Sequence, residues 1–323
     1  MRLIRIQEYN EQTMQLAKPV YDGKRRILLA AGNTIHPKYL ERLIDIGITN
    51  LIVEDAVSKG VTMEELLDMP TWLDVIDCVK SAYEAVRTGK PINLRDLLQK
   101  AGKLIDEASR RPIIVPVPSA MVADELKDYA HAVNVAIMSL QTGKQLGYNQ
   151  LQLRDLVVGV LLHDIGKAKD KSKEAHPETG FQIIRAIREI SLLSAHIAYQ
   201  HHETLDGKGF PRQLAGKEIH EYAQVCAVAD LYDHLIADEG TAPHEAMEVI
   251  MGQNGIKYSE SVVSAFVKSI PAYPPGTKVR QLDGKEAIVT RIIDHLQRPC
   301  IRLLATGEEL FLTDHPSVLI TAG

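Results

Sequence analysis

Apolar residues in the middle of the chain recur every three or four positions, which is the period of an amphipathic α-helix. This spacing is clear in YAHAVNVAIMSL, LRDLVVGVLLHD and GFQIIRAI, which begin at residues 129, 153 and 180. The pattern continues from about residue 121 to IPAYPPG at 270–276, where three prolines end it. We therefore expect this region to be wholly helical.

The two ends of the chain have a different pattern. Near the N-terminus, VYDGKRRILLAAG places Asp22-Gly23 between two strand-like runs, which predicts a hairpin. HPKYLERLIDIG predicts a helix between Pro37 and Gly47, and ITNLIVED predicts a strand after it. The last part of the chain alternates polar and apolar residues and has turn signals at 283–284 and 306–307, which indicates a small β unit.

Residues 62–110 again have helical periodicity, broken by TGKP at 88–91, and RRPIIVPVPSA at 110–120 predicts an extended linker. We therefore expect a mainly α protein with three domains. Residues 1–118 form an N-terminal α/β and then helical region, 119–270 a helical bundle, and 271–323 a small C-terminal β domain.

The composition is that of an ordinary globular protein, with 323 residues, 45% apolar, 24% charged, and a net charge of −5. This charge gives no support for direct nucleic-acid binding. No apolar run reaches the length of a membrane span, and membrane binding is not expected. The three cysteines are far apart, which fits a reducing compartment, so we expect a cytoplasmic protein.

Candidate chemistry is concentrated in the helical region, where eight of the 12 histidines lie between residues 131 and 234. His163 and Asp164 interrupt an apolar helix, and burying them there is costly without a compensating metal ion or hydrogen-bond network. Each histidine alone is explained as a structural residue. Together, imidazoles and carboxylates suit Fe, Mn or Zn, and two neighbouring ions can bind a phosphoryl group.

Four motifs occur in a fixed order: HDIGK at 163–167, HPETG at 176–180, HHETLDGKGFP at 201–211 and AVAD at 227–230. This order resembles the HD-GYP family, a branch of the HD-domain metal-dependent phosphohydrolases, over roughly residues 121–250. The resemblance implies an HD-domain helical bundle around a centre of two or three metal ions. The implied metal ligands are His131, His163, Asp164, His176, His201, His202 and Asp230.

The resemblance also implies roles for neighbouring residues. Asp164 would bridge two divalent ions, of which Fe or Mn are expected, and Lys167 would neutralise charge on the scissile phosphate. The loop that would shape the substrate site contributes Asp206, Gly207, Gly209, Phe210 and Pro211. A hydroxide bridging the two metals would hydrolyse cyclic di-GMP to pGpG, and some family members cleave further to GMP.

Four departures from the family pattern bear on this expectation. Phe210 replaces the tyrosine of the GYP signature, and the segment between Lys167 and His176 is short, which indicates a missing flap. DEGTA at 238–242 replaces an arginine-containing stretch, so Glu239 and Ala242 stand where phosphate contacts are expected. Lys127 occupies the position of a glutamate that holds a third metal in some members. Asp128, three residues before His131, is an alternative to that glutamate, but two ions are favoured.

Other interpretations remain open at this point. The chain is either a cyclic di-GMP phosphodiesterase, an HD-type phosphohydrolase of another nucleotide, or a catalytically weak nucleotide-binding and signalling scaffold. Glu203 is either a partner of the ligands or a helix-end carboxylate, and His234 is either a partner of the ligands or a solvated residue. A homodimer and signalling protein partners are further hypotheses.

Overall fold

The computed structural model describes residues 1–111, 113–293 and 295–322. Its helices are α1 (Pro37–Asp45), α2 (Met69–Arg87), α3 (Leu94–Arg110), α4 (Lys127–Gln145), α5 (Gln150–Leu161), α6 (His176–Arg185), α7 (Leu192–Gln200), α8 (Glu221–Ala237), α9 (Pro243–Gly252) and α10 (Glu260–Ser269). Its strands are β1 (Arg2–Arg5), β2 (Gln15–Leu16), β3 (Val20–Tyr21), β4 (Ile27–Leu29), β5 (Asn50–Glu54), β6 (Lys278–Gln281), β7 (Glu286–Arg291), β8 (Cys300–Leu303), β9 (Glu309–Phe311) and β10 (Ile320–Ala322). The predicted mainly α fold with small sheets at both ends is confirmed.

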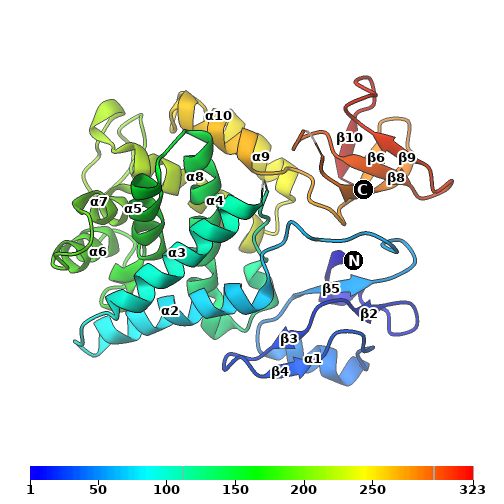
Figure 1. Cartoon of the computed structure of the whole chain (residues 1–323), viewed down its shortest axis with the longest axis horizontal. Coiled ribbons are helices and arrows are strands. Elements are labelled where there is room, and N and C mark those ends of the chain that lie inside the picture. The colour runs from blue at the N-terminus through cyan, green and yellow to red at the C-terminus, as the bar shows by residue number, and fades with distance from the viewer. Residues whose placement is uncertain (112, 294, 323) are drawn as a thin grey trace.

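Helices α2 to α10 form one bundle, and the two β units lie beside it at the same end, with α1 in the N-terminal unit (Figure 1). The N-terminal unit has an antiparallel sheet in the order β1-β5-β2 and the predicted hairpin of β3 and β4. The C-terminal unit is an antiparallel sheet in the order β10-β6-β7-β8-β9. Each unit has its own apolar cluster, separate from that of the bundle.

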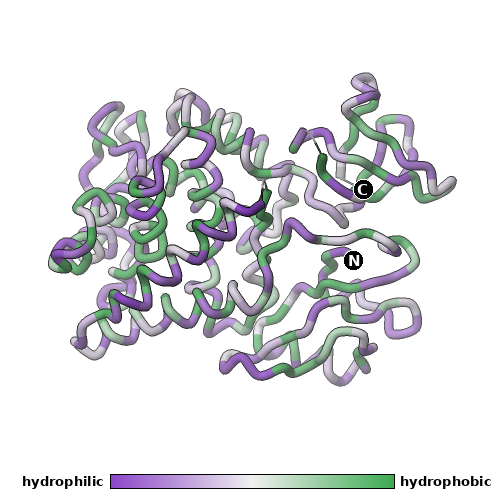
Figure 2. Tube along the Cα trace, in the orientation of Figure 1, coloured by the Kyte–Doolittle hydropathy of each residue, from purple (hydrophilic) through white to green (hydrophobic). Residues whose placement is uncertain are grey.

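The central helix of the bundle is α4, in which every residue from 129 to 143 is buried. It packs against α2, α5, α8 and α10, so its apolar residues face neighbours on all sides. The hydropathy trace shows the same pattern, with hydrophobic segments gathered inside the bundle and hydrophilic residues on outer turns (Figure 2). Helices α2 and α3 share the bundle's apolar cluster, so the first 118 residues contribute two helices to it.

The position of His163 and Asp164 differs from the prediction that they lie within a helix. Helix α5 ends at Leu161, and the chain tightens into a turn in which His163 N–H donates to the Val160 carbonyl. A short 3₁₀ helix, Ile165–Ala168, follows. The turn places His163 and Asp164 just after α5. Their side chains there lie near residues of α6 and α8 and near the end of α7.

Glycine in the HDIGK motif permits a close approach of two segments. A β-carbon on Gly166 would lie 2.0 Å from the carbonyl oxygen of His176, at the start of α6. The backbone of the turn therefore packs directly on α6, and any larger residue would separate them. This contact brings Asp164 close to His176.

No helix among the described ranges combines the length and apolar character needed to cross a bilayer.

Candidate metal centre

The seven predicted ligand side chains converge in the bundle, although they come from different elements. His131 lies on α4, His163 and Asp164 follow α5, His176 begins α6, His201 and His202 follow α7, and Asp230 lies on α8. All of these residues except His202 are buried. The sequence order alone does not place them together; the packing of five helices does.

Asp164 lies between two sets of imidazoles. Its Oδ1 is 3.2 Å from His176 Nε2 and 3.6 Å from His201 Nε2. Its Oδ2 is 3.6 Å from His163 Nε2 and contacts the ammonium group of Lys167. Each carboxylate oxygen therefore faces a separate group of nitrogen atoms.

The first set includes His202, whose Nε2 lies 3.2 Å from that of His176. Asp164, His176, His201 and His202 together form one group in which the potential ligand atoms lie within 4.8 Å of one another. His131, His163 and Asp164 form a second such group. Asp164 is common to both groups, as expected of a bridging carboxylate.

Backbone carbonyls fix which ring nitrogen of these histidines is available. His163 Nδ1 donates to Val160, His176 Nδ1 to Ser172, and His201 Nδ1 to Ala198, at 2.7, 3.0 and 3.0 Å. In each neutral ring, Nε2 then carries a lone pair directed into the site. This is the arrangement that metal-binding histidines adopt.

The centre also contains buried polar atoms without a hydrogen-bond partner. They are His163 Nε2, His201 Nε2 and Asp164 Oδ1. Leaving such atoms unpaired in a protein interior costs about 1–3 kcal/mol each. Two ligands held about 2.1 Å from one ion lie about 3–3.5 Å apart, close to the separations seen here. The residues present therefore fit divalent metal ions.

His131 is held by two carboxylates on α8. Its Nδ1 lies 2.7 Å from Asp233 Oδ2, and its Nε2 lies 2.9 Å from Asp230 Oδ1. Burial lowers the pKa of His131, but the hydrogen bonds to Asp230 and Asp233 outweigh it and raise the pKa well above its ordinary value. Asp233, which the sequence analysis missed, orients the ring; its position three residues after Asp230 was the available signal.

The charges of the other groups follow from their neighbours. Burial raises the pKa of Asp164, but His163, His176, His201 and Lys167 outweigh it and hold the pKa well below its usual range. Burial lowers the pKa of His202 to about 2, and the neighbouring His201 contributes. The centre thus presents ionised carboxylates and a neutral His202 at neutral pH.

A cavity of about 110 Å³ opens on the His131 side of the centre. It is lined by Asp164 and Lys167 and also by residues that the sequence analysis did not assign to the site, namely Lys127, Asp128, Asp233 and Asp238. His234 also lines it. Two lysines, Lys127 and Lys167, therefore line this cavity.

The predicted substrate loop lies on the opposite side, next to His202. The Phe210 ring stacks on His202 with centroids 4.4 Å apart, and Lys173 lies 5.6 Å from the Phe210 centroid. Pro211 follows Phe210 through a cis peptide bond. Asp206 and Gly207 lie on the outer turn of this loop, where Asp206 accepts from the Thr204 hydroxyl.

Glu203 ties this loop to the end of α7. Its buried carboxylate accepts hydrogen bonds from the backbone N–H groups of Arg212 and Leu214, at 2.8 and 3.0 Å. A β-carbon on Gly209 would lie 2.4 Å from the Glu203 α-carbon, so the loop passes closely over it. Glu203 therefore positions the loop that carries Phe210.

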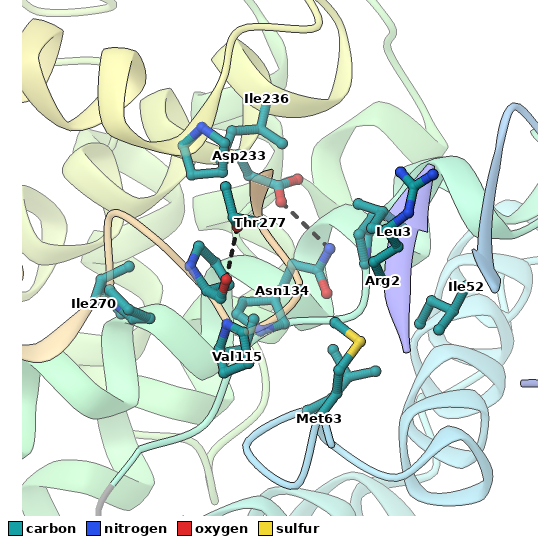
Figure 3. Close-up of a pocket in the computed structure, with 18 of the residues that line it drawn as sticks. Arg2, Leu3, Ile52, Met63, Val115, Asn134, Asp233, Ile236, Ile270 and Thr277 are labelled. Atoms are coloured by element: carbon teal, nitrogen blue, oxygen red, sulfur yellow. Dashed lines mark hydrogen bonds between the residues drawn. The ribbon is translucent and has the colours of Figure 1, made fainter. Parts of the chain in front are cut away.

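A second cavity, of about 340 Å³, lies where the bundle meets both β units (Figure 3). Leu3, Val115, Ile270 and other apolar residues line most of it. Asn134 and Asp233 stand on its wall and are joined by a hydrogen bond of 3.3 Å, drawn in Figure 3. Because Asp233 also binds His131, hydrogen bonds connect this cavity to the metal centre.

The chain is similar in sequence to an HD domain and to several phosphodiesterases. The model of the HD domain matches residues 128–235. The cyclic di-GMP phosphodiesterase PA4108 of Pseudomonas aeruginosa is 30% identical over 236 residues, which cover 65% of this chain and 56% of that protein. The 3'3'-cGAMP-specific phosphodiesterase 3 of Vibrio cholerae is 26% identical over 212 residues, covering 57% of this chain and 46% of that protein. The chain thus spans about half the length of these relatives.

Among solved structures, the fold is similar to that of Bd1817, an HDG"Y"P protein from Bdellovibrio bacteriovorus. The TM-score is 0.53 at 18% identity, over 82% of this chain and 97% of that one. Residues 128–235 thus match an HD domain, and the four motifs lie in order around one centre, which makes the chain similar to HD-GYP proteins.

Proposed function

We propose that the protein is a metal-dependent phosphodiesterase that hydrolyses cyclic di-GMP to the linear dinucleotide pGpG. The observation that carries this proposal is Asp164, whose two oxygens face two separate sets of imidazole Nε2 atoms. The relative from Pseudomonas aeruginosa, a cyclic di-GMP phosphodiesterase, supports the choice of substrate.

We propose two divalent ions, Fe or Mn, because mixed imidazole and carboxylate ligands suit these metals. One ion would be held by His131, His163, Asp164 and Asp230, and the other by Asp164, His176, His201 and His202. When bound, such ions activate water and neutralise charge on a phosphoryl group. In the overall reaction water adds to phosphorus, the bond to one ribose oxygen breaks, and that oxygen takes a proton.

The protein's own residues would bind and orient the substrate. Lys167 pairs with Asp164 and is partly exposed, so its ammonium group would contact a phosphate oxygen and stabilise developing charge. Lys127, on the same cavity, would add a second cation where the sequence lacks the expected arginines. Phe210, fixed against His202, offers an aromatic face on which a guanine base would stack.

A second candidate is a phosphodiesterase specific for another cyclic dinucleotide. Segment 238–242 carries Asp238 at the cavity and Glu239 beside it, so its charge opposes a phosphate. The relative from Vibrio cholerae is specific for 3'3'-cGAMP, which makes that dinucleotide the first alternative. A scaffold without turnover is the remaining alternative.

The proposal also covers the domain organisation, the partners and the location of the protein. We assign catalysis to residues 119–270, with 1–118 and 271–323 as flanking domains that offer surfaces for signalling partners or for a homodimer. Light scattering at several concentrations would measure the oligomeric state. We place the activity in the cytoplasm, supported by three buried free thiols.

The test is a panel assay of protein loaded separately with Fe²⁺ and Mn²⁺, using cyclic di-GMP, 3'3'-cGAMP and a phosphate monoester, with Asp164→Ala as the control. Preferential release of pGpG by the wild type alone supports the proposal. Preferential cleavage of 3'3'-cGAMP supports the second candidate. Nucleotide binding without turnover with either metal favours a scaffold.

A further inference from the structure

His234 lies on α8 one turn after Asp230 and is fixed in orientation by a carboxylate. Its Nδ1 is 2.6 Å from Asp238 Oδ2, and its ring lies 4.5 Å from that of His131 between centroids. A neutral ring that donates Nδ1–H to Asp238 presents a lone pair at Nε2. That Nε2 atom lies 3.5 Å from Asp230 Oδ1.

The same carboxylate oxygen is approached by two other imidazoles. His131 Nε2 is 2.9 Å away and His163 Nε2 is 3.5 Å away. The Nδ1 atoms of these rings are also committed, to Asp233 and to the Val160 carbonyl. Three ring nitrogens therefore converge on one carboxylate oxygen.

The potential ligand atoms of His131, Asp230 and His234 lie within 4.8 Å of one another. The neighbouring His163 Nε2 is buried without a hydrogen-bond partner, which independently indicates that an atom absent from the protein completes this region. A histidine at this position, oriented by its own carboxylate, has the arrangement of a metal ligand supported by a second residue.

We propose that His234 is an additional metal ligand on the His131 side of the centre, and that Asp238 positions it. This inference rests on the proposed metal-dependent function. It makes the two ion positions unequal: His131, His163, Asp164, Asp230 and His234 surround one, and Asp164, His176, His201 and His202 surround the other.

The first experiment measures metal retention. Wild type, His234→Ala, Asp238→Asn and the control His315→Ala, in the C-terminal β unit, are loaded with Mn²⁺ and dialysed against graded chelator. We expect His234→Ala to lose one ion at a chelator concentration about 10–100-fold lower than wild type does, and Asp238→Asn to lose it at an intermediate concentration. Circular dichroism of the metal-free proteins verifies that the variants fold. Equal retention by folded His234→Ala and wild type would overturn the inference.

The second experiment uses Co²⁺ as a spectroscopic probe of coordination. We expect the visible absorption of Co²⁺-loaded His234→Ala to differ from that of wild type and to return toward it when free imidazole is added. An unchanged spectrum rules out ligation by His234. If wild type and His234→Ala both hold two ions equally well and both hydrolyse the substrate, the assignment of His234 as a ligand fails and the proposed function stands. If wild type holds no ion, the proposed function fails as well.

Discussion

The Nε2 atom of His176 lies 3.2 Å from Oδ1 of Asp164, and a neutral His176 has no proton at that position to share. The other ring nitrogen, Nδ1, donates to the Ser172 carbonyl at 3.0 Å. An ionised carboxylate and a bare nitrogen repel each other at this distance unless a cation lies against both. The contact therefore indicates a metal site more directly than the number of histidines does.

Gly166 allows Asp164 to approach His176, and a larger residue at position 166 should disrupt the metal centre. A β-carbon in Gly166→Ala would lie 2.0 Å from the His176 carbonyl oxygen, so the turn and α6 must separate. We expect a loss of about 2 kcal/mol or more in the free energy of unfolding, together with weaker metal binding. Urea denaturation measures the first and metal analysis the second.

Gly102→Ala is the matched control, because a β-carbon at Gly102 on α3 would meet nothing within 4 Å. We expect it to stabilise the protein by about 0.5–1 kcal/mol. Equal effects of the two alanines would contradict the packing argument.

Asp233 should tune metal affinity without being a ligand in the proposed centre. It accepts from His131 Nδ1 and from Asn134, so Asp233→Asn removes the charge that orients and polarises the ring. We expect metal affinity to fall about 10–100-fold with the fold intact. Competition with a coloured chelator measures this change, and Asp106→Asn on the exposed face of α3 is the control. An affinity equal to wild type would remove Asp233 from the site.

Metal binding should release a proton from His131. Burial lowers its pKa, but Asp230 and Asp233 raise it well above the ordinary 6.5, so the metal-free ring is protonated at neutral pH. A metal that binds Nε2 must displace this proton, and affinity therefore rises with pH until pH exceeds the raised pKa. The same shift stabilises the metal-free fold fully below pH 6.5, and this contribution is lost as pH rises through the folded pKa.

Asp164, Asp230 and His202 should contribute little to this release. Burial raises the pKa values of Asp164 and Asp230, but their histidine neighbours outweigh it and hold both well below 3.8, and the pKa of His202 is lowered to about 2. Calorimetric titration with Mn²⁺ at pH 7, in two buffers of different ionisation enthalpy, should report release of about one proton. A binding enthalpy independent of buffer would contradict this.

Lys127 should assist substrate binding rather than metal binding. It begins α4, lines the cavity and pairs with Asp124 at 2.6 Å. We expect Lys127→Glu to raise KM for a cyclic dinucleotide about tenfold, because a carboxylate would then face the phosphates, while metal content stays unchanged. Lys268→Ala on α10 is the control. An unchanged KM would show that substrate does not pass Lys127.

Much of the fold follows from local signals in the sequence. Asp22-Gly23 gives the hairpin of β3 and β4, and the break at 88–91 separates α2 from α3. The turns at 283–284 and 306–307 likewise separate β6 from β7 and β8 from β9. These features depend on neighbouring residues alone, so periodicity and turn chemistry are sufficient to predict them.

The parts that sequence did not predict depend on packing between distant segments. The end of α5 at Leu161 follows from the contact of Gly166 with α6, which periodicity does not describe. The role of Asp233 requires that α4 and α8 lie side by side. Glu203 anchors backbone groups nine and eleven residues later, and a side-chain pattern does not record such contacts.

In the proposed centre, seven side chains would hold a pair of divalent ions, with Asp164 shared by both. Its most direct test is quantification of Fe and Mn in wild type and in Asp164→Ala after anaerobic purification and reconstitution. We expect about two ions per wild-type chain and loss of both in the folded variant. Less than one ion per wild-type chain, or equal metal content in the two proteins, would contradict it.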